Sequence, residues 1–408
     1  MKMTNPEDFA DVPVPSESRQ SSLSVLAVWF GFIIVVGTMA TGGGLAAQVR
    51  FSDIVTGILI GNLILGIFAA VTGWIAASSG KSFYQLGEAV FGKRSMRIVG
   101  LYVPFILIGW FAIESAILGG FLGKVLDLPD FGQRALMFLA AAVMSISAYF
   151  GFKALKRLSY ILLPVIFLLG VFAIFSTNLS GLEARQILPE HPLGLTYVAG
   201  IVVSTWIMGV LLNFPDVARF AKTPIKATLI GVFGILVGNV FNLMLGVIAS
   251  INTGSYDPAD ILIGLGFIPL AIILAAANIW TTNDNNLYSA TLGVTRSLRI
   301  HRHVAVIGCG LLGAVIAIFN PATIGSIFTV LLTVGITAPA LGGVVLGGYF
   351  GQLLGKIKGS NPATAWLGWI VGALAGFYIS GLWGILLSFA VGFVITFGRY
   401  NLQSQNVA

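Results

Sequence analysis

Long apolar blocks separated by short polar connections fill most of the chain. Blocks of about 20 residues, the helix length that crosses roughly 30 Å of hydrocarbon, recur from Ser24 to Thr396. They are continuously apolar, whereas strands of a membrane barrel alternate in polarity and run for only about 10 residues. The pattern therefore predicts an all-α membrane protein with twelve transmembrane helices over 24–48, 53–78, 97–123, 134–152, 158–176, 194–213, 227–250, 266–295, 303–319, 322–349, 363–379 and 381–398.

Two of the predicted spans carry signals of an interrupted helix. The first contains "GTMATGGG", Gly37–Gly44, where three successive glycines lower helix propensity by about 1 kcal/mol each relative to alanine. The alternative for this stretch is close helix packing through small residues. The sixth span ends in "STWIMGVLLNFPDVARF", where Pro215 is expected to stop the helix. A helix break at membrane depth is tolerated only beside protein or a water-filled cavity, so both stretches are candidate sites.

The spacing of these two spans predicts an internal repeat. Spans one and six are five apart, which is the arrangement of a five-plus-five inverted repeat with the first helix of each half broken. We therefore expect one repeat over 23–176, a second over 194–350, and two peripheral helices over 363–398.

Composition and charge agree with this class and predict its orientation. Hydrophobic residues make up 57% of the 408 positions and charged residues 9%, too few to coat a soluble globule. Eighteen of the 22 Lys and Arg residues lie in even-numbered connections or in the tails 1–22 and 399–408. Because cytoplasmic loops carry most of the positive charge, this distribution predicts that both tails are cytoplasmic. We expect the protein to lie in the inner (cytoplasmic) membrane. The net charge of +7 therefore indicates topology, and no nucleic-acid role is proposed.

The eighth span turns abruptly polar at "NIWTTNDNNLY", 278–288. On an ideal helix Asn278, Thr281, Thr282 and Asn285 fall within about 100° of one another, and Asn283 lies roughly 100° beyond Thr282. Threonine hydroxyls and carbonyl oxygens freed by a broken neighbouring helix can replace the water shell of Na⁺. The alternative is that these side chains bond only to their own helix or its neighbours.

Two carboxyl groups lie within predicted spans. Glu114 follows Trp110 by four residues, so an aromatic plate and a carboxyl share one helix face, which suits a flat heterocycle with polar edges. A charged group at this depth is a functional hypothesis by default. Asp284 lies on the side of its helix away from Thr282, and we interpret it as a solvated or paired structural group.

These residues resemble nucleobase-cation-symport family 1, and within it most closely the cytosine permeases. The resemblance runs from about Ser22 to the start of span 11. It rests on "NIWTTNDNNLYSATLG" in span eight, "IGNLILGI" in span two, "GW" at 109–110, "TGG" at 41–43 and "DVARF" at 216–220.

The resemblance implies a fold similar to the leucine transporter and uptake of a nucleobase or related heterocycle coupled to Na⁺. It assigns the ion to backbone oxygens of Phe32, Val35 and Asn278 and to the hydroxyls of Thr281 and Thr282. It assigns the substrate to a set of side chains and backbone groups comprising Trp110, Trp206, Asn283, Gly37, Glu114, Thr205 and Leu107.

The chain departs from the family at several of these positions. Cytosine permeases typically carry glutamine at the position of Leu107. They typically carry phenylalanine at the position of Trp206, which is followed here by Met208 two residues later. Hydantoin-type relatives carry an amide at the position of Glu114. A carboxylate there favours ligands with several donors, such as cytosine or hydroxymethylpyrimidine-like compounds, over hydantoins, uracil and allantoin, whereas a protonated Glu114 would also accommodate these acceptor-rich compounds.

Other functions remain as alternatives. Proton-coupled transport of another heterocycle, including hydroxymethylpyrimidine, a purine, a hydantoin or allantoin, is the main one. A channel would favour a continuous polar lining. An enzyme is not expected, because the three histidines lie near span ends without a metal-spacing motif, and Cys309 is the only cysteine. No cofactor beyond the coupling ion is predicted, and the protein is expected to be a monomer.

Overall fold

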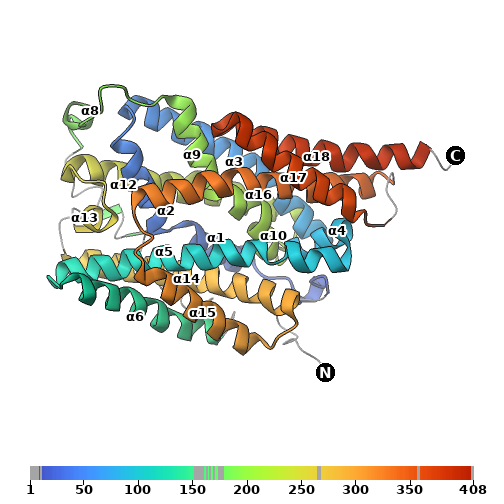
Figure 1. The fold of residues 1–408 in the computed structure, drawn as a ribbon, viewed down its shortest axis with the longest axis horizontal. Helices are drawn as coiled ribbons and strands as arrows, with labels where there is room; N and C mark the ends of the chain where they lie inside the picture. The colour runs from blue at the N-terminus through green and yellow to red at the C-terminus, as the bar shows by residue number, and fades with distance from the viewer. Residues whose placement is uncertain are drawn as a thin grey trace.

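The structure is a computed structural model that describes residues 9, 12–150, 160–161, 164, 167–168, 171–172, 179–263, 268–355 and 359–405. This part of the chain is helical, and its long helices run along the long axis of the molecule (Figure 1). The helices are α1 (Ser22–Ile33), α2 (Val36–Ala46), α3 (Phe51–Ser79), α4 (Phe83–Val99), α5 (Tyr102–Val125), α6 (Asp130–Tyr149), α8 (Leu182–Arg185), α9 (Leu195–Met208), α10 (Phe214–Ala218), α11 (Pro224–Phe233), α12 (Val240–Thr253), α13 (Pro258–Ile263), α14 (Ile268–Leu298), α15 (Arg302–Ile318), α16 (Ile324–Leu353), α17 (Pro362–Ile379) and α18 (Gly381–Gln405).

Most of the predicted spans have a helical counterpart. Eight described helical segments are long and apolar enough to cross a membrane, and the bent pair α1–α2 adds one more. Helix α14 is long enough but falls short in hydropathy because of the polar cluster in its middle, and α15 is apolar but shorter. The predicted span over 158–176 lies mostly outside the described residues.

Helix α4 is not among the predicted spans. It begins with a capping box, in which Ser82 accepts from the Gln85 backbone and the Gln85 side chain accepts from the Ser82 backbone. Lys93 and Arg94 are exposed on it. Because its polar residues interrupt the apolar pattern, the sequence gives no transmembrane signal here, and the third predicted span begins five residues before α5, within the last turn of α4.

The break in the first span lies before the glycine run, so its predicted position is wrong. Helix α1 ends at Ile33 and α2 begins at Val36, with Ile34 and Val35 in extended conformation and a bend of 46° between the two helices. The run "IIVV" at 33–36 is β-branched throughout, and crowding of such side chains against the preceding turn disfavours a helix.

The glycines themselves are helical and serve packing. A Cβ on Gly246 of α12 would lie 1.8 Å from the carbonyl oxygen of Met39, and a Cβ on Gly42 would lie 2.1 Å from that of Leu243. Both distances are far below van der Waals contact, so the backbones of α2 and α12 approach each other only because side chains are missing. The alternative of close packing through small residues is therefore correct for this stretch.

The interruption of the sixth span takes the form of a widened turn. Residues Gly209–Asn213 between α9 and α10 are π-helical, with the Phe214 N–H donating to the Gly209 carbonyl. Pro215 lies in the first turn of α10 and does not stop the helix, which continues to Ala218. Pro215 has no N–H, and the Val210 carbonyl five residues earlier accepts instead from Thr72 Oγ1 at 2.7 Å. The widened turn thus accommodates the proline that was expected to end the helix.

Candidate functional site

A buried cavity lies beside the break between α1 and α2. Its walls come from the α1–α2 break, α5, the end of α9, α14 and α16. The lining residues are Phe32, Val35, Gly37, Thr38, Thr41, Leu107, Trp110, Glu114, Ser204, Thr205, Trp206, Met208, Gly209, Thr282, Asn286, Leu331 and Val334. Side chains from both predicted repeats therefore meet at one place.

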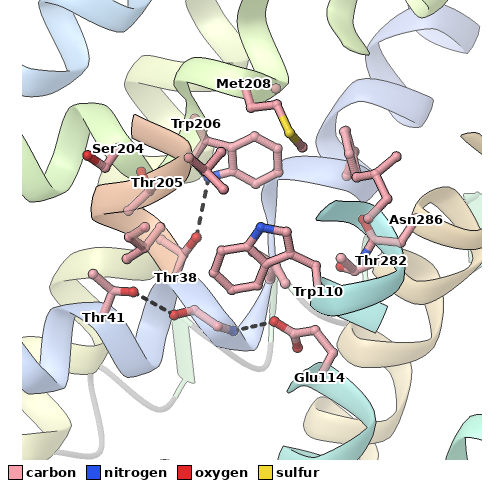
Figure 2. Close-up of a pocket in the computed structure, with 17 residues that line it drawn as sticks. Thr38, Thr41, Trp110, Glu114, Ser204, Thr205, Trp206, Met208, Thr282 and Asn286 are labelled. Atoms are coloured by element: carbon pink, nitrogen blue, oxygen red, sulfur yellow. Dashed lines mark hydrogen bonds between the residues drawn. The ribbon is translucent and has the colours of Figure 1, made fainter. Parts of the chain in front are cut away.

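Two tryptophans face this cavity from different helices. Figure 2 shows Trp110 of α5 and Trp206 of α9 as neighbours in it. The Trp206 indole is fixed, because its Nε1 donates to Thr38 Oγ1 at 3.3 Å and its ring packs edge-on against Phe32 with centroids 5.2 Å apart. A Cβ on Gly209 would lie 2.5 Å from the Trp206 ring, so this glycine makes room for the indole. The two aromatic groups predicted for stacking thus share the cavity.

Glu114 joins α5 to the first turn of α2. Its Oε1 accepts from the Gly37 backbone N–H at 2.8 Å, as the dashed line in Figure 2 marks. The Gly37 carbonyl accepts from Thr41 Oγ1, also at 2.8 Å. Both predicted residues, Glu114 and Gly37, therefore lie in the cavity wall and are bonded to each other.

The predicted ion ligands are divided between the cavity and its immediate wall. Phe32, Val35 and Thr282 line the cavity, while Asn278 and Thr281 are buried in α14 behind it. The Asn278 carbonyl accepts from Thr281 Oγ1 at 2.9 Å and from Thr282 Oγ1 at 3.1 Å. Neutral carbonyl and hydroxyl oxygens of this kind can coordinate a monovalent cation. In the described part of the chain no group of three or more His, Cys, Asp or Glu could hold a metal ion.

Asn283, predicted to contact the substrate, does not line the cavity in this conformation. Its Nδ2 donates to the Phe111 carbonyl at 3.2 Å and to Ser115 Oγ at 3.1 Å, so the amide faces α5. Asn286 lines the cavity instead, and its Nδ2 donates to Asn283 Oδ1 at 3.4 Å. Asn283 thus contacts the cavity wall through Asn286.

Helical spacing could have found Asn286 but not the lining from α16. Asn286 follows Thr282 by four residues and lies about 40° from it on the helix, whereas Asn283 lies about 100° away. Leu331 and Val334 of α16 are ordinary apolar residues in an apolar span, and nothing in the sequence sets them apart.

Thr205 and Leu107 line the cavity as predicted, and they differ in what they offer a ligand. Leu107 supplies apolar surface, whereas Thr205 Oγ1 donates to the Val202 carbonyl at 2.6 Å and accepts from Asn239 Nδ2 at 3.3 Å. Next to it, Ser204 Oγ is buried and has no hydrogen-bond partner among the described residues. Ser204 Oγ faces Gly335 of α16, where a Cβ would lie only 2.2 Å from it, and is directed away from the two tryptophans (Figure 2).

Asp284 lies away from the cavity, on the side of α14 that faces α6. It is buried rather than solvated, with Oδ1 hydrogen-bonded to Ser147 Oγ. Ser147 Oγ also accepts from Trp280 Nε1 at 2.7 Å. Asp284 is therefore not solvated, and its partner is a neutral hydroxyl rather than a cation, with Oδ2 lacking a hydrogen-bond partner among the described residues.

A broken membrane helix beside a buried cavity with aromatic and polar walls defines a secondary transporter. Comparison with known proteins specifies the class further: the family described as permease for cytosine/purines, uracil, thiamine, allantoin matches residues 13–358. The chain belongs to this family, which confirms the resemblance seen in the sequence and makes it a multi-pass membrane transporter rather than an enzyme.

The sequence identity to individual relatives is low. The chain is 28% identical to the cytosine permease of Escherichia coli (strain K12) over 350 residues, which cover 85% of this chain and 82% of that protein. It is 24% identical to the putative purine-cytosine permease YxlA of Bacillus subtilis (strain 168) over 344 residues, covering 77% of this chain and 72% of that one.

Solved structures share the fold. Mhp1, a nucleobase-cation-symport-1 family transporter in a closed conformation with bromovinylhydantoin bound, superposes with a TM-score of 0.81 at 18% identity, covering 100% of this chain and 96% of its own. A Na⁺-coupled sialic acid symporter in a substrate-bound outward-open state gives 0.69 at 13% identity, with 98% and 93% covered. The predicted leucine-transporter-like architecture is therefore confirmed.

Proposed function

We propose that this protein imports a nucleobase or related aminopyrimidine, such as cytosine, across the cytoplasmic membrane by alternating access, coupled to Na⁺. The observation that carries this proposal is the shared cavity: Trp110 and Trp206 meet there beside the broken span and the Thr282 hydroxyl. Aromatic faces stack on any flat heterocycle, while the polar groups around them contact its edge.

The support for Na⁺ comes from the oxygen ligands beside the break between α1 and α2. Val35, the extended residue just before α2, and Thr282 of α14 reach the same cavity, and the Asn278 carbonyl lies one turn before Thr282. Hydroxyl and carbonyl oxygens suit a hard monovalent cation that has to be released after transport. The ion and the ring would then occupy adjacent parts of one site, which is the arrangement that coupling requires.

The relatives support the substrate class. The names of the bacterial relatives refer to cytosine and purines, and the solved relative in the same family holds a hydantoin. Glu114 favours the aminopyrimidines among these compounds, because an ionised carboxyl only accepts hydrogen bonds and therefore suits an edge with several donors better than one rich in carbonyl groups. We place both termini in the cytoplasm, as the distribution of Lys and Arg requires.

Binding and uptake with a defined panel test the proposal. The purified protein is assayed by calorimetry against cytosine, hydroxymethylpyrimidine, adenine, hydantoin, uracil and allantoin, in Na⁺ and in choline at equal ionic strength. We expect an aminopyrimidine to bind in Na⁺ and to bind at least about ten-fold more weakly in choline. Proteoliposome uptake should show the same dependence.

Two results would contradict the proposal. Uptake that follows a pH gradient and ignores Na⁺ would support the proton-coupled alternative. Conductance without saturable binding would support a channel.

A further inference from the structure

The break between α1 and α2 leaves one helical hydrogen bond unmade. In a continuous helix the Gly37 N–H would donate to the Ile33 carbonyl, four residues earlier. Here the Gly37 N–H donates to Glu114 of α5 instead, at 2.8 Å. The Ile33 carbonyl accepts from Asn242 Nδ2 of α12 at 3.3 Å. Each half of the missing bond is therefore satisfied by a side chain from a different helix.

A regular spacing along the seventh span brings Asn242 to the break. This span consists of α11, a π-helical turn at Gly234–Asn239 and α12, and α12 lies beside α2 (Figure 1). Every fourth residue from 234 to 250 contacts the first span, and these residues are Gly234, Gly238, Asn242, Gly246 and Ser250. All but Asn242 are glycine or serine. The one larger polar residue of the series lies where the first span is interrupted.

The neighbouring members of this series have to be small. A Cβ on Gly238 would lie 2.9 Å from Ile33 Cγ2, and a Cβ on Gly246 would lie 1.8 Å from the Met39 carbonyl oxygen. Contact therefore excludes side chains one turn to either side, whereas at 242 an amide fits beside the interrupted backbone. Asn242 is 3% exposed, so water has little access to this contact. The buried Ile33 carbonyl thus depends on the amide for its hydrogen bond.

The position of this hydrogen bond links it to the ion. Ile33 lies between Phe32 and Val35, which both line the cavity and are the backbone positions assigned to Na⁺. Because a peptide group is planar, a bond to the Ile33 carbonyl fixes the orientation of that whole peptide. It thereby restricts backbone rotation between Phe32 and Val35. Asn242 itself does not line the cavity, so its effect on the ion is indirect.

From these contacts we propose that Asn242 is a positioning residue for the coupling ion. Its amide holds the Ile33 carbonyl and keeps the backbone oxygens on either side of it in the arrangement that binds Na⁺. This inference rests on the proposed coupling to Na⁺, and it adds a residue outside the cavity that sets the affinity for the ion.

Two readouts separate the ion from the rest of the cavity. The first is the midpoint of thermal unfolding in a Na⁺ series balanced with choline, which gives the half-saturating Na⁺ concentration without any organic ligand. The second is the Kd of cytosine at saturating Na⁺, measured by calorimetry. Both are determined for the wild type, Asn242→Leu and Asn242→Ala. Asn252→Leu is the matched control, because Asn252 Nδ2 donates to the Ile248 carbonyl of its own helix, α12, at 2.8 Å.

In Asn242→Leu we expect the half-saturating Na⁺ concentration to rise by about ten-fold or more, because leucine has a similar volume but cannot donate to the Ile33 carbonyl. Asn242→Ala should show a smaller rise of about three-fold, since a water molecule can enter and donate in place of the amide. The Kd of cytosine at saturating Na⁺ should change by less than about three-fold in either variant. Asn252→Leu should match the wild type in both readouts.

Each contrary result has its own meaning. If the half-saturating Na⁺ concentration is unchanged in both Asn242 variants, or if both readouts change by the same factor, Asn242 only packs α12 against the first span. The inference is then wrong while the proposed function stands. Should Asn242→Leu fail to fold, Asn242→Ala decides by the same criterion. If Na⁺ affects neither the unfolding nor the cytosine binding of the wild type, the proposed coupling fails, and this inference fails with it.

Discussion

At the scale of single residues, the two cavity tryptophans are held differently. Trp206 is 6% exposed and is fixed by Thr38 and Phe32, whereas Trp110 is only half-buried. Trp206 therefore acts as a fixed wall, and Trp110 is the more accessible ring for stacking. The difference between the two tryptophans comes from the side chains that contact each of them, since the residue type is the same.

Removing the Trp110 ring should abolish most ligand binding. Stacking of a base on an aromatic side chain contributes about 1–3 kcal/mol, so Trp110→Ala should raise Kd by roughly 5- to 150-fold in calorimetry. Trp74→Ala is the matched control, because Trp74 is 49% exposed on α3 and does not line the cavity. Equal affinities for the two variants would remove Trp110 from the site.

Removing the Thr282 hydroxyl should act on the ion. We expect Thr282→Ala to raise the Na⁺ concentration needed for half-maximal ligand binding by about ten-fold or more, while affinity at saturating Na⁺ changes little. Thr291→Ala, a buried threonine of α14 that bonds to the Tyr288 carbonyl, is the control. An unchanged Na⁺ titration would contradict the assignment of Thr282 to the ion.

The site could be predicted where helical spacing fixes a face. Trp110, Glu114 and Thr282 lie in the cavity wall as predicted, and each could be predicted because it shares a helix face with another polar or aromatic residue about one turn away. Asn283 could not be placed correctly, since its amide has acceptors on α5 that only the packed structure reveals. The partner of Glu114 was equally out of reach, because the break that frees the Gly37 N–H was assigned to the wrong residues.

At the scale of elements, low helix propensity alone did not locate the break. Three glycines within α2 remain helical because α12 packs directly on the backbone of Gly42 and Gly43, and α16 packs on Gly44. The run of β-branched residues at 33–36 is extended at Ile34 and Val35, and the Ile33 carbonyl there accepts from Asn242 Nδ2 at 3.3 Å rather than from a helical N–H. Tertiary packing therefore decides between two stretches that are both unfavourable for a helix.

Filling this contact should destabilise the protein. Gly246→Ala places a methyl group against the Met39 carbonyl, and overpacking of this kind costs about 1–3 kcal/mol. We expect a lower midpoint of thermal unfolding in detergent. Gly308→Ala on α15 is the control, since its Cβ meets nothing within 4 Å and alanine favours a helix. A Gly246→Ala protein as stable as this control would show that α2 and α12 can separate without loss.

At the scale of the whole molecule, hydropathy was sufficient for the class and for most spans. The length of apolar blocks is set by the membrane, so it can be read without knowing any contact. Helix α4 could not be found in this way, because it is too polar to give a transmembrane signal. The widened turn at 209–213 also leaves no trace in composition.

Orientation can be tested by labelling from one side of the membrane. In a Cys309→Ala background, Lys93→Cys and Glu190→Cys each place one exposed thiol, on opposite sides by the distribution of positive charge. An impermeant maleimide should label Glu190→Cys in whole cells and Lys93→Cys only in inside-out vesicles. Labelling of Lys93→Cys in whole cells would reverse the topology.

The widened turn between α9 and α10 sets the rotational phase of everything after it. A π turn holds one residue more than an α turn, and each residue advances a helix by about 100°. This offset lets Trp206 point into the cavity while Asp216, ten residues on, accepts from the Phe83 N–H at the start of α4 at 2.9 Å. If all five residues of 209–213 were instead wound as a regular α-helix, the extra residue would advance Asp216 by about 100° and turn it away from α4, so the widened turn keeps two distant contacts of one span in register.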